Sequence, residues 1–180
     1  WTPGAVSTKA LINFMAAAAI ILGYWITAGV LILIAGLFDM LDGATARTVH
    51  KTSSFGGFLD SVIDRYSDMV LLISLIIYYA IQDKIFLLTL CSIASLGTVL
   101  IPYTRAKAEA FIPQCNVGIM ERAERIILLA AGVIFNIMDI VIWLLAIFTH
   151  ITVFQRIYYT WREIQRREKM ACSHNLMKGD

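Results

Sequence analysis

Two short stretches of this sequence decide the fold: DMLDGATAR at residues 39–47 and GGFLDSVID at residues 56–64. The first contains two aspartates three positions apart, and the second contains two aspartates four positions apart. On a helix, both spacings place the two side chains on one face. The connection spans only residues 48–55, so the two helix ends lie at the same depth. We therefore expect four carboxylates to meet at one end of a helical bundle.

The four aspartates, Asp39, Asp42, Asp60 and Asp64, predict a metal site. An ionised side chain inside a membrane span costs about 2.5–3.5 kcal/mol on insertion scales, and neighbouring carboxylates also repel one another. Divalent cations remove both penalties. Ligands that are all oxygen, with no His or Cys beside them, favour Mg²⁺ or Mn²⁺. The cluster is large enough for two ions, an arrangement that suits displacement at phosphorus.

The surrounding sequence predicts an all-α integral membrane protein. Of its 180 residues, 59% are hydrophobic and 16% are charged, whereas soluble domains are typically about 45–50% apolar and about 25% charged. The apolar residues form long runs, and a membrane span needs about 20 of them. We expect a single domain over residues 1–180, a bundle of six transmembrane helices. The expected spans are 8–26, 28–41 (continuing as helix to 47), 57–81, 86–106, 119–137 and 139–159, the fifth being short enough to be tilted or covered by protein.

The distribution of charge predicts the orientation of the bundle. Six spans place both termini on one side, and that side then carries fourteen of the 15 Lys and Arg residues, all except Lys84. The positive-inside rule assigns this side, and with it the aspartates, to the cytoplasm. The short connection at residues 82–85 predicts that the third and fourth helices are antiparallel neighbours. The basic segment 162–169 is interpreted as an anchor to anionic lipid.

The pattern Asp39-x2-Asp42-Gly43-x2-Ala46-Arg47-x8-Gly56-x3-Asp60-x3-Asp64 resembles the signature of the CDP-alcohol phosphotransferase family. The resemblance implies a six-helix membrane fold, usually a homodimer, with an amphipathic helix that would lie upstream of Trp1. It also implies the site: Asp39, Asp42, Asp60 and Asp64 hold the metals, Asp64 is the general base, Gly43, Ala46 and Gly56 make room for the cytidine of a CDP-linked lipid, and Arg47 faces its phosphates. In the implied reaction, an acceptor hydroxyl attacks the lipid-side phosphorus and CMP leaves.

A basic cluster on the same side predicts the acceptor. Arg105 closes the fourth span, Arg125 opens the fifth, and Arg156 lies on the sixth. With Lys107 and Arg122 they form a group suited to a phosphorylated molecule. These stretches resemble the phosphatidylinositol phosphate synthase branch of the family and its archaeal ether-lipid relatives. That resemblance implies inositol phosphate as acceptor, held by Arg105, Arg125 and Arg156; glycerol phosphate is the alternative.

A structural interpretation accounts for part of this cluster. Arg105 and Glu109 are four positions apart, as are Glu121 and Arg125, so each couple can form an ion pair on one helix. Asp68, which lies one turn beyond the predicted base, either shapes the acceptor pocket or pairs with a basic residue.

Two other classes of function use the same acids: a divalent cation transporter and a scaffold without catalysis. A transporter places polar groups near the bilayer midplane, whereas the segments 30–37 and 70–78 offer almost no ionisable residues. The complete set of aspartates argues against a degenerate scaffold. The three Cys and three His form no zinc pattern, and a net charge of +2 indicates no nucleic-acid partner. We expect the CDP-linked lipid, inositol phosphate and membrane lipids as partners.

Overall fold

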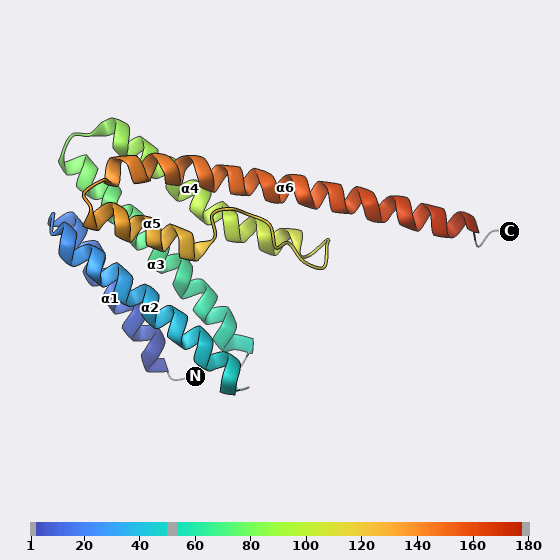
Figure 1. Ribbon diagram of the computed structural model, residues 1–180, viewed down its shortest axis with the longest axis horizontal. Helices are drawn as coiled ribbons and strands as arrows, with labels where there is room; N and C mark the ends of the chain where they lie inside the picture. Colours follow the sequence, from blue (N-terminus) through green and yellow to red (C-terminus); the bar gives the residue numbers. More distant parts are fainter. Residues whose placement is uncertain (1–2, 50–53, 178–180) are drawn as a thin grey trace.

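The computed structural model describes the backbone of residues 3–49 and 54–177 and the side chains of residues 8–38 and 55–170. Over those parts of the chain every regular element is an α-helix, so the expected all-α fold is confirmed. The helices are α1 (Pro3–Ile21), α2 (Trp25–Val49), α3 (Ser54–Ile81), α4 (Ile85–Ala108), α5 (Arg122–Ile134) and α6 (Met138–Met177). The last of these, α6, extends well beyond the other helices (Figure 1).

The turn between α1 and α2 comes earlier in the chain than expected. The backbone of Gly23 has φ +78°, a conformation that glycine adopts without steric strain. The Gly23 N–H donates to the Ile20 carbonyl at 3.0 Å, and the Tyr24 N–H donates to the Ala19 carbonyl at 2.8 Å. These two bonds form a Schellman motif, which ends a helix. The first helix therefore ends at Ile21, and the expected end at residue 26 is wrong.

The turn between α3 and α4 is built in the same way. Asp83 has φ +55°, and the Lys84 N–H donates to the Tyr79 carbonyl at 3.0 Å. Aspartate tolerates this left-handed conformation better than most residues. The chain therefore reverses within three residues, and α3 and α4 pack against each other. The prediction that these helices are antiparallel neighbours is confirmed.

The large apolar core lies at the end of the bundle opposite the aspartates. It takes in the second halves of α1 and α3, the first halves of α2 and α4, and the junction of α5 with α6. Its most buried members include Ile20, Ile32, Leu75, Val133 and Ile142, each no more than 1% exposed. The helices are thus held together most firmly near the turns at residues 22–24, 82–84 and 135–137.

Small residues bring the helix backbones close together in this core. A Cβ atom on Gly97 of α4 would overlap the Thr149 side chain of α6. A Cβ atom on Gly29 of α2 would overlap Ile134 of α5. Close backbone approach at small residues is a usual source of packing between membrane helices.

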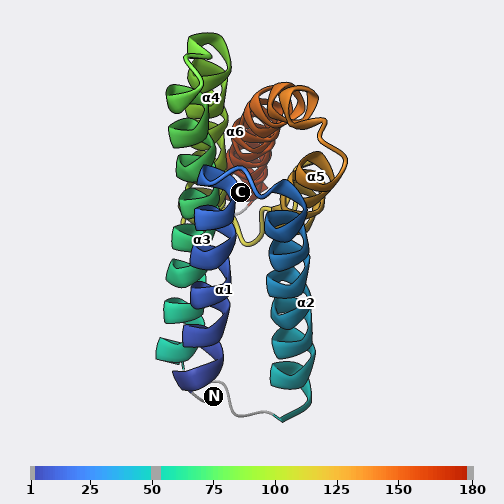
Figure 2. The same cartoon turned by 90° about the vertical axis from the view of Figure 1, so that its left-hand side faces the viewer.

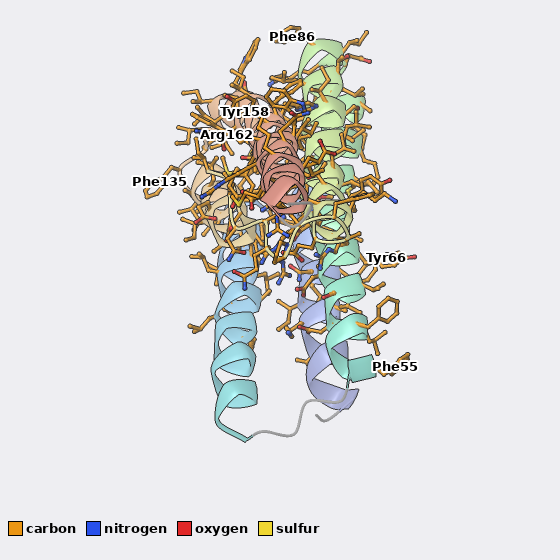
Figure 3. The ribbon with its side chains drawn as sticks, turned by 90° about the vertical axis from the view of Figure 1, so that its right-hand side faces the viewer. Phe55, Tyr66, Phe86, Phe135, Tyr158 and Arg162 are labelled. Atoms are coloured by element: carbon orange, nitrogen blue, oxygen red, sulfur yellow. The ribbon has the colours of Figure 1, made fainter. Side chains whose placement is uncertain are left out.

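Large apolar side chains also cover the outside of the bundle. Phe55, Tyr66 and Phe135 point away from the helices (Figure 3), with exposed fractions of 69%, 68% and 70%. Many more Leu, Ile and Phe residues are exposed along every helix. Soluble monomers rarely expose apolar patches of this extent, so this surface suits contact with lipid.

Two helices of the described residues are long and apolar enough to cross a membrane, Ile85–Ala108 and Met138–Met170. Within α1 and α2 the described apolar segments are shorter, Thr8–Ile21 and Trp25–Phe38. The fifth helix has 13 residues and is about 20 Å long, so it is short, as expected. The sixth continues past the expected end at residue 159. The count of six membrane crossings remains a prediction.

Candidate active site

Three aspartates form a stripe along one face of α3. Asp60, Asp64 and Asp68 are spaced four residues apart, and the exposed fraction of their side chains falls from 39% through 16% to 12%. The stripe therefore becomes more buried as α3 proceeds. A buried carboxylate must be paired or hydrogen-bonded to remain ionised.

Each aspartate of this stripe has a cationic partner. Lys9 Nζ of α1 lies 3.2 Å from Asp60 Oδ1. Arg122, the first residue of α5, bridges the other two: its Nη1 lies 2.8 Å from Asp64 Oδ2, and its Nε lies 3.5 Å from Asp68 Oδ1. The ion pairs thus tie α3 to α1 on one side and to α5 on the other.

Arg125 lies one turn further along α5 and is more deeply buried. Its Nη2 is 2.7 Å from Asp68 Oδ2, and its side chain is 7% exposed. Its Nε atom is buried and, within the described part of the chain, has no hydrogen-bond partner. An unsatisfied guanidinium N–H costs about 1–3 kcal/mol or more, and this atom is closed to solvent in the described conformation.

A polar cavity of about 150 Å³ opens between α3, α4, α5 and α6. Several water molecules or one tetrahedral anion fit in this volume. Five arginines and three carboxylates line it, so it carries an excess of positive charge. The lining residues are Asp64, Arg65, Asp68, Ile101, Pro102, Arg105, Glu121, Arg122, Arg125 and Arg156.

Arg156 of α6 is held in one place by the backbone of two other segments. It donates from Nε to the Val117 carbonyl at 2.8 Å and from Nη1 to the Ile101 carbonyl. Its side chain is 3% exposed, and its Nη2 lies 3.9 Å from Glu121 Oε1. Gly118, at φ +145°, runs over it, and a Cβ there would overlap Thr152. A pinned guanidinium of this kind presents its charge in a fixed direction.

Arg105 closes the cavity from the end of α4. Its Nε donates to Glu109 Oε1 at 3.1 Å and its Nη2 donates to Asn116 Oδ1 at 3.0 Å. The hydrogen bond from Arg105 holds the pKa of Glu109 below its usual value. Glu109 therefore stays ionised at neutral pH and fixes the orientation of Arg105.

The structure brings the three predicted acceptor residues, Arg105, Arg125 and Arg156, into one cavity. The predicted Arg105–Glu109 ion pair is present. The interpretation that Glu121 pairs with Arg125 is wrong: Arg125 reaches Asp68 on α3, and Glu121 lies nearest Arg156. Asp68 pairs with basic residues, as one interpretation expected, and it also lines the cavity; its role in an acceptor pocket stays a prediction.

Arg122, which the sequence places in the basic cluster, also lines the cavity, and so does Arg65, to which the sequence argument gave no role. Arg65 also donates to the Ser61 carbonyl one turn before it, at 2.6 Å. Arg122 carried a usable signal, because it lies three positions before Arg125 and so on the same face of a helix. That spacing indicates that both arginines approach α3 together, as they do.

Of the four aspartates expected to meet, the structure describes the side chains of two. Asp60 and Asp64 lie on one face of α3, whereas Asp39 and Asp42 lie on the last turns of α2, where side chains are outside the described residues. Among the described side chains no group of three metal-ligating residues comes together. The described parts of α2 and α3 both pack against α1 and not against each other (Figure 2).

The described aspartates fit a divalent cation by their chemistry. Both supply only oxygen atoms, which Mg²⁺ and Mn²⁺ prefer. Each already lies beside a cationic side chain, Lys9 or Arg122, so positive charge is what this face of α3 attracts. Of the residues expected to contact the CDP-linked lipid, Gly43, Ala46 and Arg47 have side chains outside the described residues, and Gly56 is buried in the first turn of α3.

Comparison with known proteins places the chain in context. Residues 1–154 match a family model described as CDP-alcohol phosphatidyltransferase. The archaetidylinositol phosphate synthase of Pyrococcus horikoshii is 36% identical over 156 residues, which cover 86% of this chain and 80% of the relative. The archaetidylinositol phosphate synthase of Methanothermobacter thermautotrophicus is 37% identical, with coverage of 86% and 82%.

Solved structures of similar shape point the same way. Phosphatidylinositol phosphate synthase of Mycobacterium tuberculosis with CDP-DAG bound superposes with a TM-score of 0.80 at 28% identity, covering 89% of this chain and 87% of that one. The same enzyme in complex with manganese and citrate gives a TM-score of 0.78 at 28% identity, with coverage of 87% and 80%.

Proposed function

Because this chain belongs to the CDP-alcohol phosphatidyltransferase family, we propose that it transfers a phosphatidyl or archaetidyl group from a CDP-linked lipid to inositol phosphate, with release of CMP. The observation that carries the proposal is the arginine-lined cavity beside Asp64. The relatives named above that make inositol phosphate lipids support the same acceptor.

The cavity favours an acceptor that carries a phosphate. Arg105, Arg125 and Arg156 approach it from three different helices, and guanidinium groups bind phosphate oxygens through paired, charge-assisted hydrogen bonds. Free inositol is therefore a poor acceptor in this proposal.

We place the chemical reaction at the end of the bundle that carries the aspartates. Asp39, Asp42, Asp60 and Asp64 would hold Mg²⁺ or Mn²⁺, in two sites, and Gly43, Ala46, Arg47 and Gly56 would hold the CDP-linked lipid. The bound ions supply charge neutralisation for the phosphates and for the departing CMP oxygen. Asp64 accepts the proton of the acceptor hydroxyl, whose oxygen bonds to the lipid-side phosphorus as the bond from phosphorus to CMP breaks. The arginines hold the acceptor while this happens.

The assembly and orientation follow the same proposal. The chain would be a multi-pass membrane protein of six spans with its site and both termini in the cytoplasm, and a homodimer. The single basic residue on the opposite side, Lys84, supports the orientation. The exposed aromatic side chains of α3 give a second copy or lipid a surface to contact.

An acceptor screen tests this function. Detergent-purified protein with Mg²⁺ is given a CDP-linked diacyl or archaeol lipid and one acceptor at a time, and CMP release is measured. We expect inositol phosphate to exceed inositol by at least about a hundredfold, since buried polar groups left unpaired discriminate strongly. Arg105→Gln should raise KM for inositol phosphate, whereas Arg162→Gln, outside the cavity on α6, should not.

Two results would change the assignment. Faster turnover with glycerol phosphate would replace the acceptor and leave the reaction type in place. Failure of every phosphorylated and free alcohol to yield CMP, with well-folded protein and Mg²⁺ or Mn²⁺ present, would refute the transferase itself.

A further inference from the structure

Arg122 lies at the junction of the predicted metal site and the predicted acceptor cavity. Its Nη1 is 2.8 Å from Asp64 Oδ2, an oxygen that the proposed function gives to a divalent ion. The same guanidinium lines the cavity together with Arg105, Arg125 and Arg156. One side chain thus belongs to both sites.

The contact with Asp64 is one that a divalent ion competes for. A carboxylate oxygen that ligates a cation carrying two charges is a weaker partner for a guanidinium with one, and the two cations also repel each other. Side chains that are 25% and 16% exposed leave room for such an exchange. The more distant contact of Arg122, 3.5 Å from Asp68 Oδ1, keeps its stem in place.

Three other arginines of the cavity, Arg105, Arg125 and Arg156, are less able to change partners. Arg156 is pinned by two backbone carbonyls, and Arg105 is held by Glu109 and Asn116. Arg125 is buried against Asp68 at 2.7 Å. Arg122 differs because its carboxylate partner, Asp64, would be taken by the divalent ion that the proposed reaction requires.

We propose that Arg122 is a positioning residue that exchanges Asp64 for the phosphate of the acceptor when the divalent ion binds, so that metal and phosphate binding reinforce each other. This inference rests on the proposed function, since it requires a metal at Asp64 and an oxyanion in the cavity. Without the ion, Arg122 neutralises Asp64. With the ion bound, its guanidinium is released toward the phosphate.

The coupling can be measured without turnover. Free Mn²⁺ is followed by electron paramagnetic resonance during titration of the purified full chain, with and without sulfate, a tetrahedral anion that keeps Mn²⁺ in solution. We expect sulfate to tighten Mn²⁺ binding by at least about fivefold, the lower end of usual coupling between two sites. In Arg122→Gln, the sulfate effect should fall to about onefold, while Mn²⁺ binding without sulfate is unchanged or tighter because its competitor is gone.

Matched variants separate this role from a structural one. Arg122→Lys keeps the charge but not the forked donors and should retain part of the sulfate effect. Arg167→Gln removes an arginine from an ion pair outside the cavity, the i,i+4 pair with Glu163 on α6, and should behave as the unmodified chain. Arg122→Gln that keeps the full sulfate effect, or that weakens Mn²⁺ binding equally with and without sulfate, would overturn the inference.

Measurements on the unmodified chain distinguish a failure of this inference from a failure of the proposed function. Mn²⁺ binding and CMP release without any effect of sulfate would refute the coupling and leave the proposed function standing. Absence of both Mn²⁺ binding and CMP release would refute the two together.

Discussion

Asp64 shows how one residue serves both the stability and the chemistry of this site. It is 16% exposed and is paired with Arg122 at 2.8 Å. An ionised carboxylate can ligate a cation and can accept a proton from an attacking hydroxyl. Asparagine has nearly the same shape but does neither well.

We predict that Asp64→Asn lowers kcat for CMP release by at least about a hundredfold, the lower range for loss of an acid–base group. The protein should still fold, because the amide oxygen can accept a hydrogen bond from Arg122. Asp83→Asn is the matched control: the left-handed turn at residue 83 suits asparagine as well as aspartate. Equal activities of the two variants would exclude Asp64 from the reaction.

The sequence predicted residues better than it predicted their partners. It placed Arg105, Arg125 and Arg156 at one site because they lie near helix ends on one side, and the structure brings them together. It did not predict that Arg122 bridges Asp64 and Asp68. That contact depends on how α5 crosses α3, and no local spacing records such a crossing.

At the scale of elements, the connection between α4 and α5 fixes one wall of the cavity by holding Arg156. Its backbone supplies the Val117 carbonyl that fixes Arg156, and Gly118 passes over Thr152 and Arg156 in a conformation open to glycine. A side chain at Gly118 is excluded twice, by φ +145° and by Thr152.

Gly118→Ala should lower the free energy of unfolding by about 1–3 kcal/mol and raise KM for inositol phosphate roughly tenfold, about 1.4 kcal/mol of binding. Thermal unfolding and the CMP assay measure the two effects. Gly23→Ala, with φ +78° and no neighbour within 4 Å of the new methyl, should cost stability alone. A raised KM in both variants would mean that backbone strain, and not the seating of Arg156, is responsible.

The contact between α4 and α6 gives a second prediction at this scale. Gly97→Ala places a methyl against the Thr149 side chain, whose hydroxyl donates to the Leu145 carbonyl at 2.7 Å. We expect a loss of about 1–3 kcal/mol, typical of overpacking, seen as a lower Tm in detergent. Gly57→Ala, where nothing lies within 4 Å, should leave Tm unchanged or raise it. No difference between the two would show that α4 and α6 are not tightly packed.

The end of α1 shows why some helix boundaries were predicted wrongly. The apolar run continues through residues 22–26, so hydropathy alone does not reveal that Gly23 ends α1. The glycine was the available signal, since a helix often stops one residue before a glycine in the left-handed conformation. The short fifth helix was predicted because its apolar run is short. The reversal between α3 and α4 was predicted because the connection at residues 82–85 is short.

For the whole molecule, the membrane orientation is the prediction most open to test. In a chain lacking its native cysteines, Asp83→Cys and Arg162→Cys each introduce one exposed thiol at opposite ends. A membrane-impermeant maleimide should label residue 83 on intact cells and residue 162 only after permeabilisation, as the charge distribution requires. The reverse pattern would place the site outside the cytoplasm, and equal labelling on intact cells would contradict the spanning bundle.

The arrangement of whole helices lay furthest from what the sequence could predict. A short connection from residue 48 to residue 55 placed the ends of α2 and α3 at the same depth, but α1 packs against both helices and they do not touch over their described lengths. Chain proximity fixes where two helix ends lie. It does not fix which helix fills the space between them.

The position of the apolar core at one end of the bundle has a consequence for how substrates reach the site. Helices packed together at one end of the bundle can part at the other end without losing their shared packing. In the proposed function, a two-tailed lipid would reach the reactive end by sliding sideways within its own leaflet, while the water-soluble acceptor would arrive from the aqueous phase on the same side. The rate of CMP release should therefore depend on the fluidity of the leaflet nearest the arginines and not on the fluidity of the other leaflet.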